Sequence, residues 1–304
     1  MVARFEGESG SREVTGRWMV VGAGGQLGTD LLLALQGQEV AAFTRADLDV
    51  TDGDAVARAV AAVVPSVIVN AAGYTAVDAA ESDEANASVA NAIAPGLLAA
   101  AAAVTGARFV HVSTDYVFAG DATTPYDEAA DTAPRSAYGR TKLAGENAVL
   151  RELAEAYVVR TAWVYGAVGN NFVKTIARLE RERDTVSVVD DQRGSPTWSH
   201  DLARGLVALG SSGADGGIYH CTNTGETTWF GFNRAIFEEL GADPERVLPT
   251  TTAAFPRPAP RPAYSVLGNR RWLAAGLEPL PHWRDALHKA FARHGAQLRA
   301  QSSS

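Results

Sequence analysis

The run Trp18-Met19-Val20-Val21-Gly22-Ala23-Gly24-Gly25-Gln26-Leu27-Gly28 decides the fold, because it joins a short apolar strand to a helix through a glycine loop. Gly22, Gly25 and Gly28 recur at every third position of this loop. Such glycines permit a tight turn and let a helix N-terminus approach a pyrophosphate closely. The spacing differs from that of the common dinucleotide fingerprint, so an ordinary glycine-rich turn is the alternative interpretation.

Beyond this loop, short apolar runs alternate with helical patterns, which is typical of a parallel sheet covered by helices. Further strands are predicted at Glu39 to Phe43, Ser66 to Asn70, Phe109 to Ser113 and Ala156 to Arg160. Helices are predicted at 29–35, after an N-cap at Asp52, at 85–105 and at 136–153. The pattern therefore predicts an α/β fold of the Rossmann type, with a doubly wound parallel sheet.

The alternation of apolar runs and helical patterns becomes irregular after Val164. We expect a polar N-terminal tail at 1–17, an NAD(P)-binding Rossmann domain at 18–165, and a smaller, mainly substrate-binding domain at 166–304. A segment at about 190–225 is expected to return to the Rossmann domain. The proline-rich stretch Phe255 to Pro262 excludes regular helix and central strand. Because ligands of open parallel sheets bind where the strand order reverses, the smaller domain should close over that edge.

Composition limits the classes of partner. The net charge of −8 over 304 residues argues against a nucleic-acid partner, which needs a concentrated basic face. The single cysteine, Cys221, excludes an intrachain disulfide and is compatible with a cytoplasmic location. No uninterrupted apolar run reaches the roughly 18–20 residues that a membrane helix needs, so we expect no membrane partner.

The end of the second predicted strand bears on the choice of cofactor. A carboxylate there would bind the ribose hydroxyls of NAD, but the chain has Thr44 and Arg45. An arginine suits the 2′-phosphate of NADPH through its fork of donors, although Arg45 is equally well interpreted as a surface charge. NADPH is therefore favoured and NADH is kept as the alternative, with Asp49 and Val50 expected near the adenine.

Two short motifs carry the strongest indication of chemistry. Ser113-Thr114-Asp115-Tyr116 follows a predicted strand, and Tyr138 and Lys142 are four residues apart, so they share one face of a helix. A lysine beside a phenol stabilises the phenolate and lowers its pKa from about 10. Tyr138 could then exchange a proton near neutral pH, while the Thr114 hydroxyl binds the same carbonyl oxygen. This arrangement predicts a reductase that acts on a keto group.

With Asn70-Ala71-Ala72, these motifs resemble the extended short-chain dehydrogenase/reductase family. Within it, the chain from about Val20 to Leu287 is similar to the dTDP-4-dehydrorhamnose reductases. That likeness rests on the strings at 113–118, 138–146, 160–165, 169–172, 191–197 and 261–265.

The resemblance implies that hydride passes from NADPH or NADH to C4′ of dTDP-6-deoxy-L-lyxo-4-hexulose, giving dTDP-L-rhamnose. It implies that Tyr138 protonates the C4′ oxygen, that Lys142 tunes Tyr138 and holds the nicotinamide ribose, and that Thr114 orients the carbonyl.

The resemblance also implies two sets of binding residues, with Asn91 supporting the cofactor region. The cofactor set is Gly22, Gly25, Gln26, Leu27, Gly28, Thr44, Arg45, Asp49, Val50, Ala71, Ala72, Tyr74, Ser113, Tyr138 and Lys142. The substrate set is Val77, Tyr116, Trp163, Asn171, Gln192 and Arg261. Arg261 would bind the diphosphate, or else brace the proline-rich loop; hydrophobic core is the alternative for Trp163.

Metal binding and assembly depend on two further positions. Some relatives are described as magnesium-bridged dimers, and the corresponding positions here are Asp30 and His200. Histidine is a poor magnesium ligand, so we predict no metal and leave monomer and homodimer open.

Other functions stay open at this point. A sugar-nucleotide dehydratase would need an Asp-Glu pair after the threonine, but Tyr116 follows Asp115. An epimerase would favour a carboxylate in place of Thr44-Arg45. A non-catalytic subunit resembling the methionine adenosyltransferase β subunit would also keep the Tyr-Lys pair.

Overall fold

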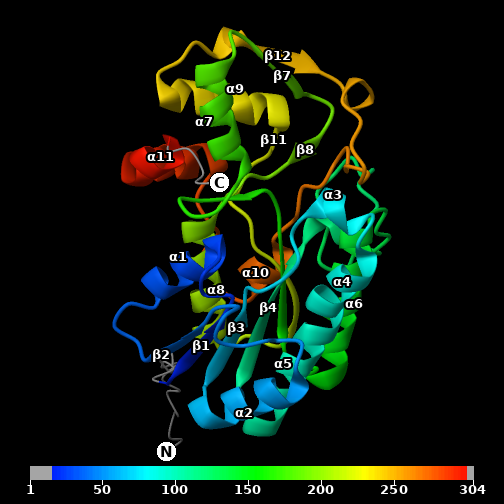
Figure 1. The fold of residues 1–304 in the computed structure, drawn as a ribbon, viewed down its shortest axis with the longest axis vertical. Helices are drawn as coiled ribbons and strands as arrows, with labels where there is room; N and C mark the ends of the chain where they lie inside the picture. Colours follow the sequence, from blue (N-terminus) through cyan, green and yellow to red (C-terminus); the bar gives the residue numbers. More distant parts are fainter. Residues whose placement is uncertain (1–15, 300–304) are drawn as a thin grey trace, which may run out of the picture.

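The computed structural model describes residues 16–299, so the polar tail predicted at 1–17 lies almost wholly outside the described residues. Figure 1 shows an elongated molecule with a helix-covered sheet at one end and a smaller group of helices and short strands at the other.

Six parallel strands form the central sheet, in the order β10-β5-β4-β3-β1-β2. Their bounds are β1 Trp18–Val21, β2 Val40–Phe43, β3 Val67–Asn70, β4 Arg108–Thr114, β5 Tyr157–Thr161 and β10 Gly217–His220. The order runs outward from β1 to β2 on one side and to β3 on the other, so it reverses at β1. The predicted doubly wound parallel sheet is confirmed, with the ends of the predicted strands shifted by at most one residue.

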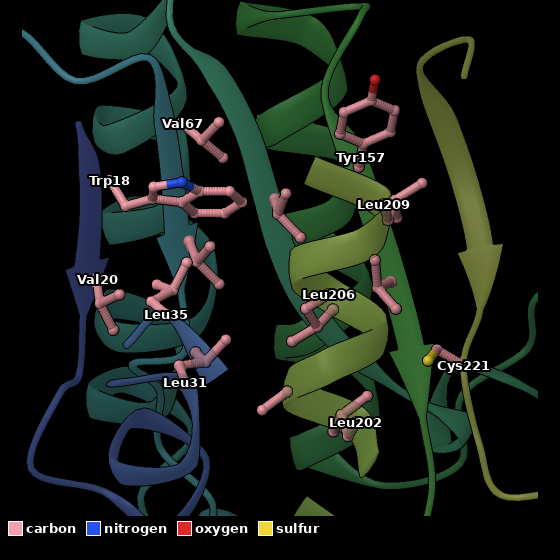
Figure 2. Close-up of a cluster of buried hydrophobic side chains, with 14 of the residues drawn as sticks. Trp18, Val20, Leu31, Leu35, Val67, Tyr157, Leu202, Leu206, Leu209 and Cys221 are labelled. Atoms are coloured by element: carbon pink, nitrogen blue, oxygen red, sulfur yellow. The ribbon is translucent and has the colours of Figure 1, made fainter. Parts of the chain in front are cut away.

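Helices cover both faces of this sheet because alternate residues of β1 point to opposite sides. Trp18 and Val20 pack on α1 Gln26–Ala34 and α8 Ser199–Ser211, in the cluster drawn in Figure 2. Met19 and Val21 pack on α2 Gly53–Val63, α5 Ala94–Thr105 and α6 Ala137–Glu152.

Local signals set the starts of two helices that cover the sheet. Asp52 caps α2, as predicted, by accepting hydrogen bonds from the amides of Asp54 and Ala55 at 3.0 and 3.1 Å. Ser136 caps α6 by accepting a hydrogen bond from the Gly139 amide at 3.1 Å.

The helix predicted at 85–105 is present as one helical run with a π-helical segment inside it. α4 Glu84–Ser88 leads through Val89–Ile93 into α5. The run Glu84–Thr105 is long and apolar enough to span a membrane by those two measures alone, but half of the window that qualifies is buried. It packs against α2 and α6 as a helix of the protein core.

A second buried cluster lies outside the sheet, in the upper part of Figure 1. It is built by α7 Phe172–Glu182, α9 Trp229–Leu240 and α11 Trp283–Arg299, with the parallel pair β7 Val186–Val189 and β12 Val247–Thr250. The remaining short elements are α3 Val77–Ala80, β6 Val164–Tyr165, β8 Arg193–Gly194, β9 Thr197–Trp198, β11 Thr227–Thr228, α10 Arg270–Ala274 and the 3-10 turns Asp115–Val117, Pro244–Arg246 and Thr252–Ala254. The 3-10 turn Thr252–Ala254 ends just before the proline-rich stretch 255–262. That stretch itself forms no helix or strand.

A buried ion pair joins α6 to the sheet. Arg160 on β5 donates to Glu146 on α6 at 2.7 Å, with the two side chains 2% and 1% exposed. The Ser113 hydroxyl on β4 donates to the same carboxylate. The pair therefore fixes α6 against two neighbouring strands.

Replacing Glu146 by alanine is expected to lower the free energy of unfolding by about 3–5 kcal/mol, because it leaves the Arg160 charge buried without a partner. The measurement is urea unfolding followed by circular dichroism. Glu152→Ala is the control, since Glu152 pairs with Arg151 on the exposed side of α6 and its loss should cost under about 1 kcal/mol. Equal effects of the two substitutions would contradict the role given to the buried pair.

Candidate active site

The glycine loop after β1 lies at the reversal of strand order and is packed too closely for a side chain at Gly22 or Gly28. Gly22 has φ of +84°, and a Cβ there would lie 2.7 Å from the Ala72 amide nitrogen. A Cβ on Gly28 would lie 2.1 Å from the Gly22 carbonyl oxygen. Gly25 precedes α1, and no side chain caps this helix. The loop thus leaves the N-terminus of α1 open, and it fits the pyrophosphate of a dinucleotide.

The end of β2 presents one free cation. The Thr44 amide and hydroxyl both donate to Asp47, at 2.9 and 2.6 Å, and lower the pKa of its carboxyl. Thr51 holds Asp49 in the same way, at 2.9 and 2.7 Å. Arg45 is exposed and forms no ion pair with any of residues 16–299. Of the predicted pair, Arg45 is therefore the residue free to bind a phosphate, whereas Thr44 is already bonded to Asp47.

The segment after β3 is held by two buried amides. Asn70 accepts a hydrogen bond from the Ala72 amide at 3.0 Å and lies 3.2 Å from His111. Burial lowers the pKa of His111 well below its usual value, so this histidine is neutral. Asn91, in the π-helical segment, accepts from the Tyr74 amide at 2.8 Å. These contacts fix the backbone of Ala71, Ala72 and Tyr74 beside the glycine loop.

Thr114 and Tyr138 come together at the carboxyl end of β4. Thr114 is the last residue of β4 and Tyr138 is the second residue of α6. Burial raises the pKa of Tyr138 to about 12, although the nearby Thr114 hydroxyl partly offsets this effect. Tyr116 meets the Tyr138 ring edge-on, with centroids 5.5 Å apart. Tyr138 is therefore a protonated phenol near neutral pH.

The Lys142 ammonium is held by the backbone of β4. This ammonium donates to the Val112 carbonyl oxygen at 2.6 Å, whereas the pKa of Tyr138 is raised by burial and lowered by Thr114. Burial lowers the pKa of Lys142 to about 8, against the opposing charge of Glu146. The expected lowering of the Tyr138 pKa is not found in the chain alone, because burial raises that pKa.

The Ser113 side chain is turned toward α6. Its hydroxyl donates to Glu146 and the residue is 3% exposed. The side chain is therefore bonded within the protein, and only its backbone is left to contact a cofactor.

Arg261 contacts both α3 and the proline-rich loop. Its guanidinium pairs with Asp78 at 2.9 Å and donates to the Ala259 carbonyl at 3.1 Å. Arg257 pairs with the same carboxylate at 3.2 Å. The charge of Arg261 lowers the pKa of Tyr116, which burial raises. The structure thus brings Arg261 close to Tyr116 and to α3, which begins at Val77. Asp78 is the partner of Arg261 that the sequence analysis did not identify.

Trp163 has an unusual backbone and a covered face. Its φ of +49° lies in the left-handed region, which a bulky residue rarely adopts. The indole stacks on Trp229, with centroids 3.6 Å apart and planes 8° apart. A Cβ on Gly194 would lie 2.5 Å from the ring. At most one face of Trp163 is therefore left for a sugar.

The two remaining predicted substrate residues are bonded elsewhere. Asn171 caps α7 and donates to Gln26 at 2.9 Å, so it joins the second cluster to the glycine loop. Gln192 donates to Thr252 at 2.9 Å. Neither contact places these residues against Tyr138.

The positions considered for a metal are joined to other partners. Ser199 donates to Asp30, and His200 faces Arg293 at 3.1 Å. Within residues 16–299, no group of three acidic, histidine or cysteine side chains is arranged to hold a metal ion.

A parallel sheet with a glycine loop at its reversal, followed by the Thr114, Tyr138 and Lys142 arrangement, defines a short-chain dehydrogenase/reductase of the extended type. The chain belongs to the family described as RmlD substrate binding domain, whose model matches residues 16–295.

Comparison with individual proteins agrees with this family. The chain is 54% identical to dTDP-4-dehydrorhamnose reductase of Streptomyces griseus, over 90% of this chain and 93% of that protein. It is 53% identical to a probable dTDP-4,6-dihydroxy-2-methyloxan-3-one 4-ketoreductase of Streptomyces antibioticus, over 90% and 94%. The crystal structure of dTDP-4-dehydrorhamnose reductase from Bacillus anthracis in complex with NADP matches with a TM-score of 0.89 and 39% identity, covering 92% of this chain and all of that one.

Gly28→Ala is expected to weaken NADPH binding by about tenfold or more, because relieving the clash with Gly22 costs about 1–3 kcal/mol. Fluorescence titration of NADPH measures this effect. Gly213→Ala is the matched control, since its Cβ would meet nothing within 4 Å. Unchanged NADPH affinity in folded Gly28→Ala would exclude the loop as the pyrophosphate site.

Proposed function

We propose that the chain reduces the 4-keto group of dTDP-4-dehydrorhamnose to give dTDP-L-rhamnose, using NADPH and, less well, NADH. The observation that carries the proposal is a protonated Tyr138 beside Thr114, at the sheet edge where the glycine loop is open for a dinucleotide. The activity named for the relatives, at 54% identity over nearly the full chain, supports the same substrate class.

The reduction needs one hydride and one proton. The nicotinamide, when bound, supplies the hydride to C4′ of the sugar. Tyr138 gives its phenolic proton to the C4′ oxygen; its pKa of about 12 keeps that proton in place until the oxygen becomes basic. Thr114, adjacent to the phenol, hydrogen-bonds the same oxygen.

Lys142 is proposed to hold the nicotinamide ribose. It is a buried ammonium already fixed at one donor by the Val112 carbonyl, and two further donors are available to ribose hydroxyls. Its proposed influence on Tyr138 would then depend on the bound cofactor, since none is found in the chain alone.

At the substrate end, Arg261 is proposed to bind the diphosphate. To do so, the diphosphate competes with Asp78 for the guanidinium, which is 16% exposed. Val77 and Tyr116 line the sugar, and the free face of Trp163 packs against it. Asn171 and Gln192 act at the margin of the site, by holding Gln26 and Thr252.

The proposed cofactor-binding and substrate-binding regions follow one another along the chain. Residues 18–165 bind the cofactor and residues 166–304 mainly bind the substrate, with β10 in the 190–225 segment returning to the sheet. We expect the reaction to take place in the cytoplasm, by a monomer or a homodimer.

The test is turnover of NADPH with dTDP-4-dehydrorhamnose made in situ, followed by absorbance and by identification of the product sugar. Tyr138→Phe should lower kcat by about 10²–10⁴-fold, because it removes the proton donor and keeps the ring. Tyr157→Phe is the control. Tyr157 is the first residue of β5, at the end of the strand away from the site, and its hydroxyl donates to the Ala214 carbonyl; kcat should be unchanged.

Absence of turnover with intact NADPH binding would contradict the proposal and favour the non-catalytic subunit. Offering the 4-keto sugar nucleotide before and after epimerisation distinguishes related substrates, since one relative is named dTDP-4-keto-6-deoxy-D-glucose reductase. Reduction of the unepimerised sugar alone would keep the reaction class but change the substrate.

Arg45→Ala is expected to weaken NADPH binding roughly tenfold to a hundredfold, because it removes the free cation at the end of β2. NADH, which lacks the 2′-phosphate, should bind within about twofold of wild type. Arg58→Ala, an exposed arginine of α2, is the control. Equal losses for both cofactors would show that Arg45 does not bind the phosphate.

A further inference from the structure

Asp115 is a buried carboxyl beside the reacting groups that the mechanism above does not use. It follows Thr114 directly and is 2% exposed. Its Oδ1 accepts a hydrogen bond from the Thr114 hydroxyl at 3.0 Å. Its Oδ2 is fully buried and has no hydrogen-bond partner among residues 16–299. A buried carboxylate oxygen without a hydrogen-bond partner is costly. This cost favours the protonated, neutral form of Asp115.

The Thr114 hydroxyl has one proton and it is already in use. The oxygen accepts from the Tyr116 amide at 3.3 Å and donates to Asp115. A hydroxyl can donate only once. While the Asp115 carboxylate accepts this hydrogen bond, Thr114 has no proton to donate to a substrate oxygen.

A proton on Asp115 resolves both problems. The Ser265 hydroxyl neighbours Asp115 closely enough to affect its pKa, and it too is buried without a partner among the described residues. Protonation removes the negative charge from the partnerless Oδ2. A neutral carboxyl is also a weaker acceptor than a carboxylate, which releases the Thr114 proton to a more basic oxygen.

The surroundings of Asp115 disfavour its charge. Burial raises its pKa to about 6, against the lowering effects of Ser265, Thr114 and the amides of Asp115 and Tyr116. The phenols of Tyr116 and Tyr138 face it, and its charge raises the pKa of each. Arg261 and Asp78 act on Tyr116, and no cation of residues 16–299 forms an ion pair with Asp115.

We infer that Asp115 is a positioning residue of the keto reduction: as a neutral carboxyl it frees the Thr114 proton for donation to the C4′ oxygen, and as a carboxylate it withholds that proton. This inference rests on the proposed function. Its chemistry adds no co-reactant, because the proton on Asp115 stays in place through the cycle.

The test is the pH dependence of kcat and kcat/KM between about pH 5 and 7.5, a range below the pKa of about 8 of Lys142, in wild type and two variants. Asp115 is neutral below its pKa, so wild-type kcat/KM should fall about tenfold per pH unit as pH rises above it. Asp115→Asn cannot ionise, and its activity should lose this alkaline limb. Ser265→Ala removes a group that lowers the Asp115 pKa, and should shift the limb to higher pH. Asp121→Asn, at an exposed aspartate paired with Arg135, should keep the wild-type profile.

Three results would overturn the inference: a wild-type profile without the limb, a limb that persists in Asp115→Asn, or loss of kcat at every pH in folded, NADPH-binding Asp115→Asn. The last result would show that the carboxylate itself is required. Failure of the proposed function is distinct, because wild type would then show no turnover at any pH.

Discussion

The catalytic face of α6 depends on the buried ion pair between Glu146 and Arg160. Tyr138, Lys142 and Glu146 are spaced by four residues, so they lie along one face of the helix. Glu146 is anchored to β5 through Arg160 and to β4 through Ser113. Rotating or sliding the helix would break this buried contact, which leaves a charge without a partner. The ion pair therefore sets where Tyr138 stands at the sheet edge, two turns away.

The same constraint explains why Lys142 is an ammonium held against a carbonyl. Burial lowers its pKa and the Glu146 charge opposes that effect. The helix brings the side chain under β4, where the Val112 carbonyl is the acceptor within reach. Tyr138 is then governed by its own burial and by Thr114. In the chain alone, the lysine and the tyrosine act on different partners, although they share a helix face.

Local sequence predicted the elements well and the contacts between distant elements poorly. The sheet followed from apolar runs, and the Asp52 cap and the Tyr138–Lys142 face from spacings of a few residues. The Ser113 hydroxyl, by contrast, turned out to bond Glu146, 33 positions away. The Asp78 partner of Arg261 could not be found from the sequence either, because a charge in a proline-rich loop has many acidic candidates. Such pairs are decided only when tertiary packing brings the elements together.

Trp163 is a strained residue at the place where the second buried cluster meets the sheet edge. Trp163 adopts its positive φ two residues after the end of β5, and the cost of about 1–3 kcal/mol for such a conformation must be offset by its surroundings. The stack on Trp229 and the absence of a side chain at Gly194 supply that support from the second cluster. Because β5 also carries Arg160, the strand that anchors the catalytic helix leads directly into the strained tryptophan. β5 thus connects the ion pair between Glu146 and Arg160 to the stacked indoles of Trp163 and Trp229.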